Sequence, residues 1–359
     1  VRFAPAVKTV SSRTDQRSTA EIESALLEGH VVLVRQPVKK AGAQAQAPLR
    51  ATAGRADYQD AGETLRLTEN PRVEDSGLQL TANSIDVSQR SGEAFAHGDV
   101  KATWLAVAES NGHGKAHAGS GPGPLGGQAP AHVVSDEARF NQSEGEAVFR
   151  GHARLWQDAN SIAAPQIVLN REKQTLQAKT TSLDEPVVAV LQGTGDAAAA
   201  MLPGVTRRNS TGAQQGPSVI RVRGGQFDYA DAEHRAVMSG ATLGSVVAEA
   251  GGATCTAQEV VLLLRPRGTN TATAEVERVT ASGDVVVNSQ GRKGAGEKLV
   301  YTSLTGEYAL TGTPEEPPRL TDPSRGMVTG SALIFNSRDD SVSIEGRGHE
   351  TRMETTAPK

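Results

Sequence analysis

The residues of this chain that could carry out chemistry are few and scattered. Neither a Gly-x-Ser-x-Gly nucleophile elbow nor a His-Glu-x-x-His zinc motif occurs. The stretch Gly112-His-Gly-Lys-Ala116 resembles part of a phosphate loop, but it lacks the leading glycine and the hydroxyl residue after lysine. His113, His117 and His132 share one flexible stretch, and such histidines rarely have the fixed scaffold that a metal ion needs. The sequence therefore predicts no enzyme, no metal site and no cofactor.

The remaining reactive side chains also favour structural interpretations. His30, His97 and His152 each adjoin a glycine, at positions that we expect to face solvent. Cys255 lies between threonine and alanine residues, without a neighbour that would activate a thiol. We therefore expect Cys255 to be a small strand residue.

The composition excludes several classes of protein. The 37 basic and 41 acidic residues are dispersed, so no basic stripe for nucleic acid is present. One cysteine excludes a disulfide scaffold and a Cys-based zinc site. No apolar run approaches the roughly 20 residues of a membrane-spanning helix. Because the sequence begins at Val1 and shows no signal pattern, we expect a processed piece of a longer product.

The most informative feature is a repeat in which an aromatic or aliphatic residue precedes a glycine by eleven positions. Polar turn-formers lie between the two, so each copy is typical of a β-hairpin. The copies are Val87 to Gly98, Phe140 to Gly151, Tyr229 to Gly240, Tyr301 to Gly312 and Phe335 to Gly346.

Alternation around each glycine predicts which face of the strand is buried, because residues two apart share a side. Apolar residues stand two and four positions from Gly98 and Gly151, whereas His97, Arg150 and His152 occupy the alternate positions. The pattern indicates an all-β chain with one apolar and one solvated face. An alternative interpretation of residues 18–29 is a capped helix that ends at a glycine.

Three polar, glycine-rich stretches, 36–49, 109–130 and 192–217, interrupt the repeats, and we interpret them as loops inserted between strands. The array is also expected to extend upstream, because residues 1–36 begin in the middle of a repeat. The predicted organisation is repeats at 1–108, an insertion at 109–130, repeats at 131–191, an insertion at 192–217, repeats at 218–350 and a disordered tail at 351–359.

The apolar stripe admits two interpretations on residue patterns alone. Two sheets could close on each other, so that the stripe is an ordinary core. Alternatively, the sheets could stay partly separated and line a groove for an apolar ligand. Two features favour the groove: the stripe mixes small side chains with large ones, and an open stack leaves no cap at either end. Composition alone does not decide between the two interpretations.

The segments 53–58, 65–75, 80–87 and 92–100 resemble the OstA-like family of lipopolysaccharide-transport proteins, which includes LptA-type periplasmic bridge proteins and the N-terminal domain of the outer-membrane lipopolysaccharide assembly protein. The similarity lies in Leu65-Arg-Leu-Thr-Glu-Asn-Pro-Arg-Val73 and in Gly92-Glu-Ala-Phe-Ala-His-Gly-Asp-Val100. The pattern recurs in 137–180 and 297–346. This chain departs from the family in its length, about twice that of one bridge module, and in its insertions.

The resemblance implies a β-jellyroll of stacked antiparallel strands that forms an open, V-shaped trough, as one continuous stack or two in tandem. It also implies a non-enzymatic carrier of lipopolysaccharide in the periplasm, whose partners are lipid A, related transport proteins and possible head-to-tail copies of itself. Arg and Lys at the rim would meet the phosphorylated sugar head. The residues expected to line the lipid groove are Val100, Phe149, Leu155, Met238, Val285, Leu310 and Ile344.

Two other functions compete with the carrier. A structural or adhesive β-solenoid would have a closed core and would use its insertions as binding loops. An enzyme that cleaves polysaccharide is less favoured, because no pair of acidic residues recurs at a special position.

Overall fold

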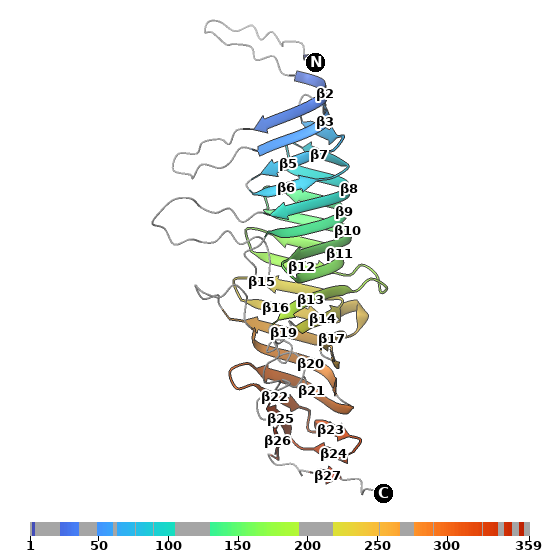
Figure 1. Ribbon diagram of the computed structural model, residues 1–359, viewed down its shortest axis with the longest axis vertical. Coiled ribbons are helices and arrows are strands. Elements are labelled where there is room, and N and C mark those ends of the chain that lie inside the picture. The colour runs from blue at the N-terminus through green and yellow to red at the C-terminus, as the bar shows by residue number, and fades with distance from the viewer. Residues whose placement is uncertain are drawn as a thin grey trace, which may run out of the picture. The chain divides into compact units, whose positions relative to one another are not determined.

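The computed structural model describes residues 2–3, 22–35, 49–59, 63–75, 77–88, 90–104, 130–193, 218–250, 252–265, 276–289, 291–324, 326–336, 341–346 and 352–354 (Figure 1). Within these ranges the chain forms β-strands and one 3-10 helix, η2 (Ala241–Leu243). The all-β class of stacked antiparallel strands is thereby confirmed. Residues 22–35 form a strand, so the helical interpretation of 18–29 is wrong there.

The strands up to residue 157 are β1 (Arg2–Phe3), β2 (Ile22–Arg35), β3 (Leu49–Gln59), β4 (Thr64–Thr68), β5 (Arg72–Asp75), β6 (Leu78–Thr81), β7 (Ser84–Ser88), β8 (Glu93–Trp104), β9 (Ala131–Asn141) and β10 (Glu146–Gln157). The following strands are β11 (Asn160–Asn170), β12 (Thr175–Lys179), β13 (Val187–Gly193), β14 (Ser218–Gly224), β15 (Gln226–Ala230), β16 (Arg235–Ser239), β17 (Val246–Ala250), β18 (Ala253–Ala257), β19 (Glu259–Leu264), β20 (Val276–Ser289), β21 (Arg292–Thr302), β22 (Glu307–Thr311), β23 (Arg319–Asp322), β24 (Gly326–Thr329), β25 (Ala332–Asn336), β26 (Ser341–Glu345) and β27 (Arg352–Glu354).

The chain forms two compact units. Unit 1 comprises Val1–Gly121, Ala129–Ala153 and Val168–Glu172, and unit 2 comprises Pro122–Gln128, Arg154–Ile167 and Lys173–Lys359. The units meet in sequence within β10 and β11, whereas the sequence-based organisation placed its divisions at the insertions. Those insertions lie almost entirely outside the described residues.

In unit 1 the strands are arranged in two rows that share long strands. Residues 55–59 of β3 pair with β4, and residues 50–52 pair with β5. β4 pairs onward with β7 and β5 with β6, and both lines meet again on β8. We call the line through β4 and β7 row A and the line through β5 and β6 row B.

Unit 2 repeats this arrangement, with β20 and β21 as long strands that belong to both rows. β20 pairs with β19 in row A and with β18 in row B, and β21 pairs in the same way with β22 and β23. Row A of unit 2 continues through β12, β15, β16, β25 and β26, and row B through β13, β14, β17, β24 and β27.

β27 corrects one expectation about the C-terminal tail. Residues 352–354 pair with residues 327–329 of β24. Row B therefore gains a strand, because residues 352–354 pair with the edge of β24. The prediction of disorder is wrong for these three residues. The other residues of 351–359 lie outside the described part of the chain.

Two glycines of the repeat, Gly98 and Gly151, lie inside the long strands β8 and β10, where each strand passes from one row to the other. Gly98 and Gly151 have φ of 71° and 73°, and the residues that follow them, Asp99 and His152, are also left-handed. In β8 the pairing with β9 shifts between His97 and Val100, which is a β-bulge at the corner. A Cβ on Gly98 would collide with the Asn83 side chain, so the corner needs glycine.

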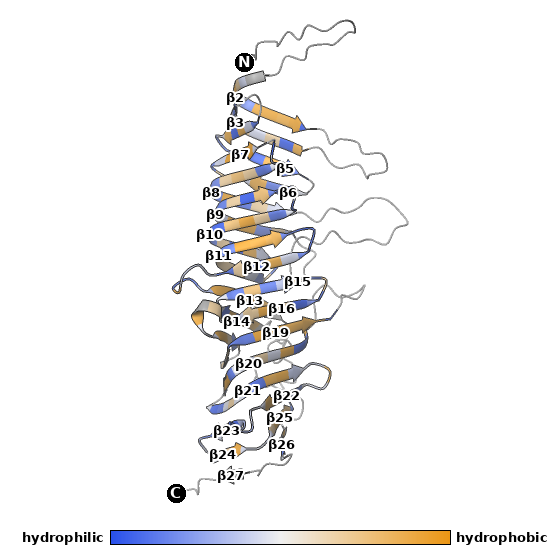
Figure 2. Cartoon of the chain, turned by 180° about the vertical axis from the view of Figure 1, so that it is seen from behind, coloured by the Kyte–Doolittle hydropathy of each residue, from blue (hydrophilic) through white to orange (hydrophobic). Residues whose placement is uncertain are grey.

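The glycine corners preserve the alternation that the sequence predicted. In β8, Ala96 and Val100 are buried on either side of the bulge, while His97 and Asp99 are exposed. Hydrophobic and hydrophilic colours accordingly alternate within individual strands in Figure 2.

β9, the partner of β8, lacks such a glycine, and its buried positions change from odd to even numbers. Val133 and Ser135 are buried before the corner and Ala138 after it. The buried Ser135 hydroxyl donates to the carbonyl oxygen of Glu137 at 2.8 Å. The change of parity therefore follows from one residue lying opposite the two residues of the bulge.

Candidate functional site: the apolar interior

The candidate site is the apolar face that the two rows of each unit bury. Six of the seven residues expected to line a groove are at most 1% exposed: Val100, Phe149, Leu155, Met238, Val285 and Leu310. Ile344, in β26, is half-buried. The six side chains are therefore buried, and their role as lipid contacts stays a prediction.

In unit 1 the interior is crossed by three aromatic rings. Trp104 contacts Phe149 edge to face, with ring centroids 5.9 Å apart. Phe149 contacts Phe140 in the same manner at 5.7 Å. Because Trp104 ends the row B part of β8 and Phe140 lies in the row A part of β9, the rings join the two rows. We call these three side chains the aromatic bridge.

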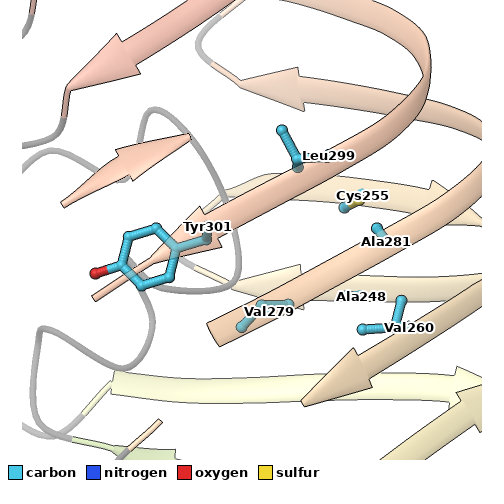
Figure 3. Close-up of a pocket in the computed structure, with 7 residues that line it drawn as sticks. All are labelled: Ala248, Cys255, Val260, Val279, Ala281, Leu299 and Tyr301. Carbon is cyan, nitrogen blue, oxygen red and sulfur yellow. The ribbon is translucent and has the colours of Figure 1, made fainter. Parts of the chain in front are cut away.

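In unit 2 smaller side chains leave an apolar cavity of about 10 Å³, which is roughly the space of one water molecule. Row A contributes side chains from β19, β20 and β21, and row B contributes side chains from β17 and β18 (Figure 3). The lining residues are Ala248, Cys255, Val260, Val279, Ala281, Leu299 and Tyr301.

Two titratable groups of unit 2 are buried, Cys255 beside the cavity and Tyr308 next to Tyr301. Burial raises the pKa of the Cys255 thiol to about 11, so the thiol is protonated at neutral pH. Burial, with a smaller contribution from the charge of Tyr301, also raises the pKa of Tyr308. The two tyrosines face each other across β21 and β22, with ring centroids 4.6 Å apart.

The histidines lie outside this interior. His30, His97 and His152 are exposed, as the sequence predicted. The Nδ1 atom of His152 lies 2.8 Å from Oδ2 of Asp136. His132 contacts the Thr103 hydroxyl at 3.0 Å, while His113, His117 and the loop 112–116 lie outside the described residues. Across the described part of the chain, no group of three His, Cys, Asp or Glu side chains could hold a metal ion.

Basic side chains near several hairpin ends are matched by acidic ones. Arg90 pairs with Glu63 and Arg139 with Glu93. Arg292 lies 3.0 Å from Asp322, whose pKa is lowered to about 2 chiefly by hydrogen bonds from Ser324 and then by Arg292. A basic rim that receives phosphate groups therefore stays a prediction.

The sequence reasoning did not identify the aromatic bridge or the cavity. Trp104 has the same parity as Val100, so alternation alone could have placed it inside. Its contact with Phe149 joins different rows and left no local signal.

In the part of the chain that the structure describes, no helix has the length and apolarity to cross a bilayer.

Comparison with known proteins supports one family. Residues 221–340 match the family described as LptA/(LptD N-terminal domain) LPS transport protein. No curated protein matches this chain in sequence. Among solved structures, LptH of Pseudomonas aeruginosa, described as the LptA homologous periplasmic component of the lipopolysaccharide transport device, is 14% identical.

The comparison with LptH covers 43% of this chain and 97% of that protein, with a TM-score of 0.28. At this score the structural likeness is weak, so the assignment rests on the sequence match. The resemblance to the OstA-like lipopolysaccharide-transport family, first seen in residues 53–100, is thus confirmed by a separate match over residues 221–340.

Proposed function

We propose that this protein is a non-enzymatic carrier or bridge for lipopolysaccharide in the periplasm. The family match over residues 221–340 is the observation that carries the proposal. The buried apolar face supports it, because each unit repeats similar apolar side chains along successive strands. Lipid A acyl chains would lie between row A and row B.

The energetics of burial define how such a carrier works. An acyl chain of about twelve methylenes would gain about 10 kcal/mol on full burial, because each methylene contributes about 0.8 kcal/mol. Several chains held in this way would not be released. Partial contact that is repeated from one strand to the next allows the lipid to move between sites of similar affinity.

Photo-crosslinking at adjacent residues of β16 tests the carrier. Met238 is buried, and its neighbour Val237 belongs to the opposite face of the same strand. A crosslinking side chain at position 238 should capture lipopolysaccharide during transport in cells, and one at position 237 should not. Equal capture at both positions, or no capture at position 238, would contradict the proposal.

The closed packing favours a second candidate, a structural or adhesive β-solenoid. The interior side chains named above are nearly inaccessible, as in an ordinary core. A solenoid would bind no fluorescent lipid A analogue at any concentration at which the protein stays folded. Saturable binding that is lost on competition with unlabelled lipid A would favour the carrier.

We further propose that β2 pairs with a similar protein or with another copy of this chain. Among the described residues, β2 pairs with β3 from Ala25 to Arg35, with a bulge between Glu28 and Val31, but meets β1 only at Ser24 and Ile22. Leu26, Val32 and Val34 are 48%, 52% and 55% exposed, and β2 is largely coloured as hydrophobic in Figure 2. Such an apolar edge strand is a template for strand addition.

Sedimentation at increasing concentration tests this assembly. Val34→Lys should weaken concentration-dependent association, because a lysine on an edge strand disfavours pairing. Val219→Lys is the matched control, since Val219 is equally exposed but lies on β14 of unit 2, which pairs with β13 and β17. Association that persists in Val34→Lys, or that Val219→Lys weakens equally, would contradict a role for β2.

A further inference from the structure

The aromatic bridge of unit 1 differs from ordinary core packing in where its rings come from. Trp104 is the last residue of β8, opposite Ala131 in row B. Phe140 is opposite Ala94 in row A. The turn at 142–145 joins β9 to β10, so Phe149 follows the row A part of β9. The bridge is therefore a continuous chain of side chains from one row to the other.

This arrangement obstructs any elongated ligand that lies between the rows at this level. Edge-to-face contacts at 5.9 and 5.7 Å are the usual separations for packed rings, and they leave no space for a methylene chain between them. An acyl chain in the interior of unit 1 would have to displace at least one ring.

Trp104 is the ring best placed to move. Phe149 is fully buried between the other two rings, whereas Trp104 and Phe140 are both half-buried. Of these two, Trp104 is the last residue of its strand, while Phe140 lies within β9. The backbone beside it is anchored, because Thr103 lies opposite His132 and their side chains are 3.0 Å apart. Rotation of the indole would therefore expose an apolar path without breaking the pairing of β8 with β9.

We propose that the aromatic bridge is a gate for acyl chains, with Trp104 as the moving ring and Phe149 as the fixed one. The inference rests on the proposed carrier function. In the closed state, the three rings block the space between row A and row B. In the open state, a saturated acyl chain passes between the rows, and the displaced indole packs against that chain.

Tryptophan fluorescence provides a direct test, because the chain has only two tryptophans. Trp156→Phe leaves Trp104 as the sole tryptophan, whose emission can be excited apart from that of the tyrosines. Dibromostearic acid, whose bromine atoms quench only an indole that they contact, should quench Trp104, and unlabelled stearic acid should shift its emission. In the reciprocal variant Trp104→Phe, Trp156 is the control: it lies between the buried Leu155 and Gln157, on the opposite face of β10, and should not be quenched.

Exchange of bound lipid provides the second measurement. Release of radiolabelled lipid A should be roughly two- to tenfold faster from Trp104→Ala than from the unmodified protein, which is the effect of losing one edge-to-face pair. Trp104→Phe retains a ring and should show a smaller change. Circular dichroism of each variant checks that the strands persist.

The outcomes separate the gate from the carrier. If lipid A binds but Trp104 is neither quenched nor shifted, or if Trp104→Ala releases lipid at the unmodified rate, the gate is wrong and the carrier stands. If lipid A binds neither the unmodified protein nor any folded variant, the carrier itself is wrong. Quenching of Trp104 together with faster release from Trp104→Ala supports the gate.

Discussion

The interiors of the two units are filled differently although their strands pair in the same way. In unit 1, Trp104, Phe149 and Phe140 join row A to row B through aromatic contacts. In unit 2, Tyr301 and Tyr308 contact each other within row A, and small side chains leave a cavity between the rows. One repeat pattern therefore supports both a tightly bridged interior and a more loosely filled one.

This difference separates two properties that a lipid carrier needs. Stacked strands require only that apolar side chains alternate along each strand. Passage of a ligand depends in addition on how far those side chains reach from one row toward the other. The comparison can be tested by substitutions that alter one interior and leave the other unchanged.

The largest effect is expected from Phe149→Ala. Loss of a fully buried ring with two aromatic partners should lower the free energy of unfolding by about 3–5 kcal/mol. Leu299 lines the cavity of unit 2, where packing is already incomplete. Leu299→Ala should therefore lower the free energy of unfolding by only about 2 kcal/mol, at the low end for such substitutions. Urea unfolding, with hydrogen exchange to assign the loss to each unit, measures both. Equal losses would remove the distinction between the interiors.

The next largest effect is a loss of stability at high pH through Cys255 of unit 2. Because the pKa of Cys255 in the folded protein is about 11, against 9.0 for an ordinary thiol, the unfolded chain ionises first. The protonated, buried thiol therefore contributes stability that is fully present below pH 9 and is lost as the pH rises toward 11. The total loss in the free energy of unfolding is about 2–3 kcal/mol. Urea unfolding at several pH values should show the loss, and Cys255→Ala should abolish that part of it. An unchanged pH dependence in Cys255→Ala would contradict the burial of this thiol.

A smaller effect is expected from adding volume to each interior. Ala96→Val places two methyl groups in a fully buried site of unit 1 and should destabilise by about 1–3 kcal/mol through overpacking. Ala281→Val directs its methyl groups toward the cavity of unit 2 and should cost less than about 1 kcal/mol. Thermal unfolding compares the pair. If Ala281→Val were the more damaging, the cavity would not provide usable space.

The smallest effect is expected on the outer faces. Arg139→Gln in unit 1 removes the partner of Glu93, and Arg292→Gln in unit 2 removes one partner of Asp322. Exposed ion pairs contribute little, so neither change should measurably alter the midpoint of thermal unfolding. A clear shift in one variant alone would mean that the outer faces, and not only the interiors, distinguish the units.

Much of the fold could be predicted from residue patterns because they reflect local geometry. The eleven-residue spacing located the corner glycines, and alternation placed Val100 inside and His97 outside. The same reasoning could not place the faces of β9 throughout, because its parity changes at a corner that carries no glycine. The 352–354 strand was also missed, since three residues that pair with a distant edge leave no periodic signal.

Residue patterns are sufficient to predict that the chain forms strands, where its corners lie and which side chains of the glycine-bearing strands are buried. Each of these follows from the two-residue period of a strand and from the conformational freedom of glycine, which act over a few neighbouring residues. The folded chain was needed to see that Trp104 contacts Phe149, which lies 45 positions away, and that Cys255 and Tyr301 line a common cavity. Such contacts depend on the fold of one row onto the other and on the volumes of side chains from strands distant in sequence, which no local period specifies.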